Sequence, residues 1–239
     1  MILATITCTA GYAPTSSGTC VDTQLDFYNC GSVGYVCPST SRSCSGGTCI
    51  PRSVRLVGAV AVSGLSSSNT IDDSTGIINL PVNITFYNYS SSNITVTSNG
   101  VLCLDTCNKA YASSSLPSAS FAGPTVFAFW ADLDIYNDAI QGVYYGVSGS
   151  APNRITTFEF LEATHGKSSS YNQFQITFSE NLPNIVECFY IETNSGAYKP
   201  TIGVQKSATG PHITYATNRI NPVAANTTIT FDTNAGTYT

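Results

Sequence analysis

Charged residues are scarce in this chain. Lys, Arg, Asp and Glu make up 10% of its 239 residues, compared with about 25% in an ordinary soluble protein. The formal net charge is −5 and no basic run occurs, so the electrostatic footprint of a nucleic-acid-binding protein is missing. The solvent-facing surface must instead be built largely from Ser, Thr, Asn and Gly, and such a surface favours contacts with glycans and proteins.

Long apolar segments and catalytic motifs are also missing. No apolar run approaches the roughly 18 residues of a membrane-spanning helix, so no membrane span is expected. The first six residues lack the charged region and apolar core of a signal peptide, and we expect a leader to have been lost from this sequence. No P-loop, dinucleotide-binding or nucleophile-elbow motif occurs. The two histidines, His165 and His212, lie in loop-like contexts, and we expect no catalytic activity.

Cysteine is abundant by contrast, and six of the nine cysteines lie between positions 8 and 49. A segment of about 50 residues is too short to bury a sufficient core, so disulfides must stabilise it. These six are Cys8, Cys20, Cys30, Cys37, Cys44 and Cys49, and their spacing leaves the pairing open. Cys103 and Cys107 are expected to form a short loop disulfide. Cys188 is then the odd cysteine, and we expect a buried free thiol, with an interchain disulfide as the alternative.

Four Asn-x-Ser/Thr glycosylation acceptors occur, three of them within eleven residues. They are Asn83, Asn88, Asn93 and Asn226. Dense cysteine indicates an oxidising compartment. Together with the acceptor sites it predicts a secreted, N-glycosylated extracellular protein.

Residues 51–239 show the two-residue alternation of half-buried strands, as in Phe174, Ile176 and Phe178. Turn signals rich in Gly, Pro, Asn and Ser separate these short segments, a pattern typical of a sandwich or barrel. The sequence therefore predicts an all-β protein with a β-sandwich at residues 51–239. Residues 1–50 are predicted to form a small disulfide-rich module.

Asp132 and Asp134 are the strongest candidate site residues. On a strand they share one face, opposite the predicted core residues Phe129, Ala131 and Leu133. Asn137 and Asp138 follow closely, and four oxygen donors over so short a stretch would suit Ca²⁺. The structural interpretation is favoured, in which Arg154 pairs with Asp132 or Asp134, because a covered charge needs a partner. The carboxylate pair of a glycosidase, formed by Asp132 and Asp134 or by Glu159 and Glu162, is the least favoured interpretation.

Aromatic side chains are the second group of candidates. Tyr111, Tyr136, Tyr171 and Tyr198 lie in polar stretches, where tyrosine can stack on sugar rings or anchor an interface. The alternative is ordinary loop packing. Trp130 is the only tryptophan, and we expect a structural role for it.

An ordered set of motifs resembles nidogen-type (NIDO-like) extracellular β domains. Residues 80–87 read LPVNITFY, residues 98–102 SNGVL, residues 129–134 FWADLD, residues 142–145 GVYY, residues 151–154 APNR and residues 202–205 IGVQ. The strand pair at residues 174–190 is similar as well. The resemblance implies an extracellular β domain that acts in adhesion or matrix assembly without a defined catalytic activity.

The first unit resembles an EGF-like module through the sequences around Cys8 and Cys20. It differs from EGF spacing because six residues, not one, separate Cys37 from Cys44. The combination is similar to secreted fungal wall or matrix proteins.

These observations predict a structural or adhesive glycoprotein of the extracellular matrix or cell wall that self-associates, with filaments as one form of assembly. Exposed strand edges would supply the contact. Glycans at Asn88 and Asn93 would blunt such an edge unless they point away from it, in which case the edge would serve assembly. The alternative is a carbohydrate-binding module assisted by Ca²⁺. The expected partners are further copies of the chain and matrix or wall glycans.

Overall fold

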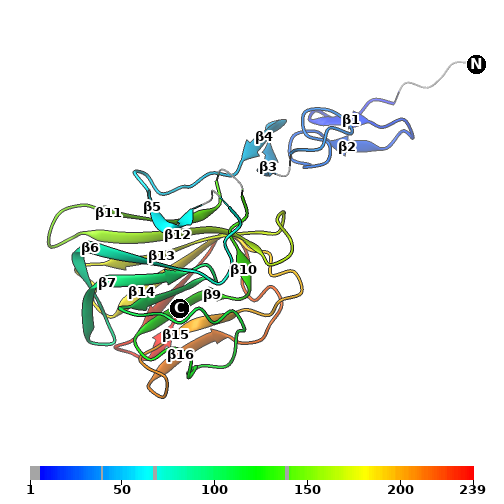
Figure 1. Cartoon of the computed structure of the whole chain (residues 1–239). Helices are drawn as coiled ribbons and strands as arrows, with labels where there is room; N and C mark the ends of the chain where they lie inside the picture. Colours follow the sequence, from blue (N-terminus) through cyan, green and yellow to red (C-terminus); the bar gives the residue numbers. More distant parts are fainter. Residues whose placement is uncertain (1–5, 39, 67–68, 138–139) are drawn as a thin grey trace, which may run out of the picture. The chain divides into compact units, whose positions relative to one another are not determined.

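A computed structural model of the chain describes residues 6–38, 40–66, 69–137 and 140–239 (Figure 1). The chain divides into two compact units, Met1–Ser53 and Val54–Thr239. The described residues contain no helix, and therefore none long and apolar enough to cross a membrane. The predicted all-β class is confirmed.

The first unit consists of two small hairpins held by disulfides. Strand β1 (Tyr12–Pro14) pairs with β2 (Cys20–Asp22), and β3 (Ser41–Ser45) pairs with β4 (Thr48–Pro51). The disulfides are Cys8–Cys20, Cys30–Cys44 and Cys37–Cys49. The apolar cluster of this unit contains little beyond cystine sulfur and Phe27, so the disulfides replace a conventional core, as predicted.

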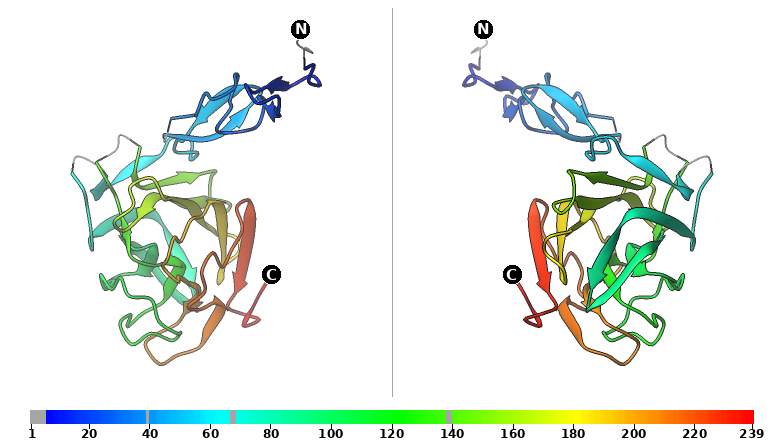
Figure 2. Two further views of the ribbon diagram at one scale, coloured as in Figure 1. Left: turned by 90° about the vertical axis from the view of Figure 1, so that its right-hand side faces the viewer. Right: turned by 90° about the vertical axis from the view of Figure 1, so that its left-hand side faces the viewer.

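Two antiparallel sheets form the second unit (Figures 1 and 2). The first sheet has the order β18-β17-β14-β13-β12-β11-β5, and β10 also pairs with β12. Its strands are β5 (Val60–Ser66), β10 (Leu133–Asp134), β11 (Gly142–Ser148), β12 (Ile155–Thr164), β13 (Tyr171–Ser179), β14 (Ile185–Glu192), β17 (Thr227–Asp232) and β18 (Thr237–Tyr238).

The second sheet has the order β16-β15-β9-β8-β7-β6. Its strands are β6 (Thr75–Phe86), β7 (Tyr89–Thr97), β8 (Val101–Leu104), β9 (Thr125–Trp130), β15 (Thr201–Gln205) and β16 (His212–Ala216). Both sheets are built mainly from strands that are rich in Val, Ile, Thr, Phe and Tyr, the residues that fit a pleated, half-buried surface.

The main core lies between the two sheets. On β13, Phe174, Ile176 and Phe178 belong to this core, and Phe160 of β12 stacks on Phe174 with ring centroids 4.9 Å apart. The Tyr190 hydroxyl on β14 donates a hydrogen bond of 2.7 Å to the Ala128 carbonyl on β9, which joins one sheet to the other. Burying each large apolar side chain contributes about 1.5–3 kcal/mol, so this sandwich interface dominates the stability of the unit.

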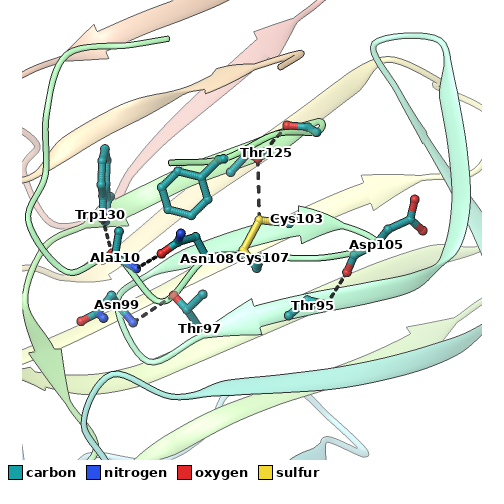
Figure 3. Close-up of a disulfide and its surroundings, with 12 residues drawn as sticks. Thr95, Thr97, Asn99, Cys103, Asp105, Cys107, Asn108, Ala110, Thr125 and Trp130 are labelled. Atoms are coloured by element: carbon teal, nitrogen blue, oxygen red, sulfur yellow. Dashed lines mark hydrogen bonds between the residues drawn. A yellow bond between two sulfur atoms is a disulfide. The ribbon is translucent and has the colours of Figure 1, made fainter. Parts of the chain in front are cut away.

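A smaller apolar cluster covers the opposite face of the second sheet. It is formed by Phe127 and Trp130 of β9 together with Phe121 and Leu116 of the β8–β9 connection. Phe129, between these two strand residues, faces the main core. The structural role predicted for Trp130 is confirmed, since its indole Nε1 donates a 2.7 Å hydrogen bond to the Ala110 carbonyl (Figure 3).

The predicted Cys103–Cys107 disulfide fastens the start of the same connection (Figure 3). Cys188 lies in the main core as a buried free thiol, and burial raises its pKa to about 12. The thiol is therefore held in its neutral, unreactive form.

A buried carboxylate fastens the segment that leads into β5. Glu159 of β12 accepts hydrogen bonds from the backbone amides of Arg55 and Leu56, at 2.9 and 2.8 Å, and from the side-chain amides of Gln173 and Gln175, at 2.7 and 2.9 Å. Burial raises the pKa of this carboxyl, and the hydrogen bonds oppose that effect. Glu159 thus has a structural role as a hydrogen-bond acceptor. The sequence alone would also allow it in a catalytic carboxylate pair.

Glu159→Ala is expected to lower the free energy of unfolding by about 2–4 kcal/mol, because it leaves several buried donors without an acceptor. Urea unfolding followed by circular dichroism measures the change. Glu187→Ala, at an exposed position of β14 in the same sheet, should change stability by less than about 0.5 kcal/mol. Equal effects of the two variants would contradict this role.

Candidate functional site

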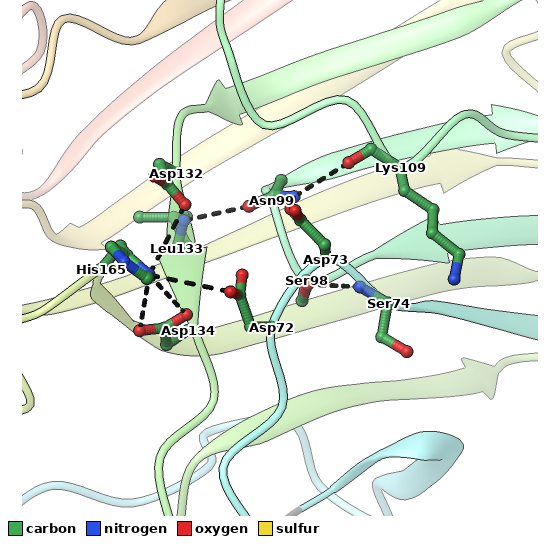
Figure 4. Close-up of polar contacts among 10 residues, drawn as sticks. All are labelled: Asp72, Asp73, Ser74, Ser98, Asn99, Lys109, Asp132, Leu133, Asp134 and His165. Carbon is green, nitrogen blue, oxygen red and sulfur yellow. Dashed lines mark hydrogen bonds and ion pairs between the residues drawn. The ribbon is translucent and has the colours of Figure 1, made fainter.

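Four aspartates and a histidine gather where three separate segments meet (Figure 4). Asp72 and Asp73 precede β6, Asp132 and Asp134 lie at β10, and His165 follows β12. We call these five residues the acid–histidine cluster. An antiparallel bridge between Ile71 and Ile135 brings the first segment to β10, and the His165 amide donates to the Asp132 carbonyl at 3.1 Å.

His165 is the centre of the cluster. Its Nδ1 lies 3.1 Å from Asp134 Oδ1, 3.8 Å from Asp132 Oδ1 and 4.0 Å from Asp72 Oδ2. Asp134 is only 3% exposed, and its register opposite Ala163 places it beside the turn that carries His165. When protonated, the imidazole therefore supplies the positive charge that a covered carboxylate requires.

Asn99 holds the remaining aspartate and β10 together. Its Nδ2 donates to Asp73 Oδ1 at 2.8 Å, and its Oδ1 accepts from the Leu133 amide at 3.0 Å. Asn99 is itself fully buried, so the turn between β7 and β8 acts as a rigid support for the cluster.

The charges of the cluster shift one another's protonation. The hydrogen bond to Asp134 is the main cause that raises the pKa of His165. Burial, followed by neighbouring carboxylates, raises the pKa of Asp72, and burial likewise raises that of Asp132. Burial and a hydrogen bond to Asp134 raise the pKa of Tyr136 to about 12. The cluster therefore favours a bound proton or cation.

Two overlapping groups within the cluster have metal-ligand geometry. One is Asp72, Asp134 and His165, and the other is Asp72, Asp73 and Asp132. In each group, one ligand atom per residue lies within 4.8 Å of the others. The oxygen-rich second group has the hard donors that Ca²⁺ prefers, whereas the imidazole in the first is better suited to a transition metal.

A cavity of about 330 Å³ shares Asp132 with the cluster. Side chains from four loops line it, and they include Tyr111, Ser113, Asp132, Tyr198, Lys199 and Asn218. Tyr111 and Tyr198 are two of the four tyrosines that the sequence predicts as ligand-stacking candidates. Of the other two, Tyr171 is buried and Tyr136 contacts Asp134.

Comparison with known protein families identifies the second unit. Residues 53–239 match a family described as NIDO related.

The chain belongs to the NIDO-related family.

No curated protein and no solved structure is similar enough to this chain to count as a match. The family match confirms the resemblance predicted from the motifs at residues 80–205. It suggests a domain of the extracellular-matrix type, and a NIDO-type domain combined with several disulfides is typical of extracellular proteins.

The NIDO-related domain brings together only part of the predicted cation site. Asp132 and Asp134 meet as expected, but the residues that join them are Asp72, Asp73 and His165. Asn137 is exposed, and Asp138 lies outside the described residues. In the sequence, Asp72 and Asp73 are no more than an Asp-Asp pair in a loop. Only the long-range bridge to β10 places them beside the other acids of the cluster.

The predicted pairing of Arg154 with Asp132 or Asp134 is wrong. Arg154 pairs with Glu180, with Nε 2.8 Å from Oε2. The cause is the register of β12 and β13, in which Ile155 lies opposite Ser179 and so places the two charged neighbours together. Asp134 lies opposite Ala163 near the other end of β12. At a rise of roughly 3.3 Å per residue, the length of β12 keeps Arg154 away from Asp134. His165 pairs with Asp134 instead.

All four predicted glycosylation acceptors of the NIDO-related domain are exposed. Asn83 lies on β6, Asn88 in the following turn, Asn93 on β7 and Asn226 directly before β17. The Asn88 Oδ1 accepts a hydrogen bond from Asn184 Nδ2, which leaves the Asn88 nitrogen, the atom a glycan would use, outside that bond.

Glu162 of β12 lies outside the acid–histidine cluster, but the cluster affects its pKa. It is fully buried, and neither carboxyl oxygen has a hydrogen-bond partner among the described residues. Burial first, and the negative charge of Asp134 second, raise its pKa well above the ordinary value. The folded domain therefore favours the uncharged acid.

Glu162→Gln is expected to stabilise the domain relative to wild type more at pH 7 than at pH 4. Between the ordinary glutamate pKa and the raised one, the folded state keeps a proton that the unfolded chain has lost, so wild-type stability falls as pH rises. The amide cannot titrate and escapes this loss. Urea unfolding at both pH values tests the difference, with Glu187→Gln at an exposed site as the control. An effect independent of pH would contradict the argument.

Proposed function

We propose that this protein is a secreted glycoprotein with a structural or adhesive role in extracellular matrix or cell wall, and without catalytic activity. The observation that carries the proposal is the NIDO-related match over residues 53–239. The four disulfides support an oxidising compartment, and the exposure of all four acceptor asparagines supports glycosylation.

The finer assignment of the first unit as EGF-like stays a prediction. Its three disulfides support a small extracellular module, joining the first cysteine to the second, the third to the fifth and the fourth to the sixth. The same holds for similarity to fungal wall proteins, which the combination of this unit with a NIDO-related domain supports.

Self-association is part of the proposal, and the sheet edges are its most suitable contacts. Strand β6 is twelve residues long and pairs only with β7 in its sheet, but Pro81 and a register shift between Asn79 and Ile84 blunt its middle. Strand β16, at the other edge, contains neither proline nor a glycosylation acceptor. It therefore offers backbone groups with less protection than β6.

Glycans would leave the edges open. Asn83 is exposed between the buried residues Val82 and Ile84, and Asn93 lies opposite the exposed Asn79. Because side chains alternate across a strand, these acceptors project from the outer face of the sheet and away from its edge. Glycosylation and edge pairing are thus compatible.

Light scattering coupled to size exclusion, with negative-stain imaging, tests the assembly over a wide concentration range. The wild-type chain is expected to form oligomers or filaments that persist in high salt, because its surface has few charges to screen. Monomers at every concentration would reject self-association.

The second candidate function is carbohydrate binding, assisted by Ca²⁺. The specific observation in its favour is that tyrosines and a carboxylate line one cavity beside the acid–histidine cluster. Asp72, Asp73 and Asp132 would hold the cation through oxygen, and Asp132 would link the cation to the cavity.

Calorimetric titration with CaCl₂ tests this cation directly. Wild type is expected to bind one Ca²⁺, and Asp72→Asn is expected to weaken binding at least about tenfold because it removes a carboxylate from the oxygen-rich group. Glu187→Gln, an exposed acid outside the cluster, should bind as wild type does. The absence of binding heat in wild type would remove Ca²⁺ from the proposal.

A further inference from the structure

We infer that the cavity between Tyr111 and Tyr198 binds one ring of a neutral saccharide, with the ring stacked on Tyr111. This inference rests on the carbohydrate-binding function proposed above and adds the place, the platform and the charge class of the ligand. A volume of about 330 Å³ lies at the small end of ligand-binding cavities, which suits one ring of a longer chain.

Tyr111 provides an uncovered aromatic face. Its side chain is 50% exposed, although it lies in a loop that is packed against the second sheet. Tyr198, on the segment between β14 and β15, is partly buried against the main core and is therefore held in place. A tyrosine ring combines an apolar face with a polar tip, which matches a sugar ring with apolar C–H faces and a rim of hydroxyl groups.

The polar lining provides both donors and acceptors. Asp132 accepts, Lys199 donates and Asn218 can do both, while Ser113, whose hydroxyl donates to the Lys199 carbonyl, can still accept. A sugar hydroxyl also donates and accepts, and its bond to a carboxylate is of the stronger, charge-assisted kind. The lining therefore fits a polyhydroxylated ligand better than a purely apolar one.

The surrounding charges select against anions. Asp132 stands within the cavity wall, and Asp72, Asp73 and Asp134 lie in the adjoining cluster (Figure 4). Positive charge comes from Lys199 in the cavity wall and, when it is protonated, from His165 in the cluster. The four carboxylates of the cavity wall and the cluster outnumber these cations. While the cluster holds no Ca²⁺, the local field is thus negative and would repel phosphate or uronate groups.

The cavity is fixed before any ligand arrives. The Ser113 hydroxyl donates to the Lys199 carbonyl at 2.8 Å and joins two of its walls. The Thr201 hydroxyl donates to the Ser114 carbonyl at 2.8 Å, and the Trp130 indole secures Ala110 at the start of the same loop (Figure 3). A preformed site loses less conformational entropy on binding.

The experiment uses the full chain and immobilised trisaccharides of glucose, N-acetylglucosamine, mannose and galacturonic acid, with and without CaCl₂. Wild type is expected to bind at least one neutral trisaccharide and, without CaCl₂, to bind the galacturonic acid trimer at least about tenfold more weakly. Tyr111→Ala should weaken binding by at least about tenfold, as the loss of an aromatic anchor does. Asp132→Asn should weaken it as well, while Tyr28→Ala, an exposed tyrosine of the first unit, should not.

The outcomes separate the inference from the function on which it rests. If wild type binds no trisaccharide in either condition, both the cavity and the carbohydrate-binding function are rejected, while self-association stands or falls on its own measurement. If Tyr111→Ala and Asp132→Asn bind as wild type does, carbohydrate binding stands and this cavity is rejected. Preferred binding of the galacturonic acid trimer without CaCl₂ would reject the neutral class of ligand.

Discussion

Burial of aromatic and aliphatic side chains between two antiparallel sheets is the interaction on which the rest of the second unit depends. A chain with 10% charged residues has few ion pairs to contribute, and exposed pairs are worth little in any case. Strand β9 connects the core of the sandwich to the loops around it. Phe129 faces the main core, while Trp130 faces outward and secures the β8–β9 connection that forms one wall of the cavity.

The register of β12 distributes the charges of the domain. At its start, Arg154 meets Glu180 across the hairpin with β13. Near its end, Asp134 lies opposite Ala163, and His165 follows in the turn. In its middle, Glu159 accepts backbone and side-chain donors on one face. A single strand thus separates a half-buried ion pair, a structural carboxylate and the acid–histidine cluster.

The features that depend on local sequence pattern could be predicted from the sequence. Alternation at Phe174, Ile176 and Phe178 located a strand and its buried face, and the two-residue spacing of Asp132 and Asp134 placed both acids away from the main core. The disulfide-stabilised first unit, the Cys103–Cys107 bond and the buried thiol of Cys188 followed from cysteine spacing and context.

The features that could not be predicted depend on long-range strand register and on the paths of loops. Nothing near Asp72 in the sequence indicates that a bridge from Ile71 to Ile135 will carry it to Asp134. The predicted pairing of Arg154 with Asp132 or Asp134 is wrong because period-two patterns do not reveal which end of β12 meets which neighbour. The meeting of Tyr111 with Tyr198 depends on two loops, whose paths are set by the packing of Trp130 and by single hydrogen bonds.

Oxidised cysteines stabilise this protein, and an aromatic sandwich core encloses its one remaining thiol. Thiol alkylation with mass-spectrometric peptide mapping, performed on native and on urea-unfolded protein without reductant, tests both statements most directly. We expect no alkylation of the native protein, and alkylation of Cys188 alone after unfolding. Alkylation of Cys188 in the native state, or of further cysteines in either state, would contradict them.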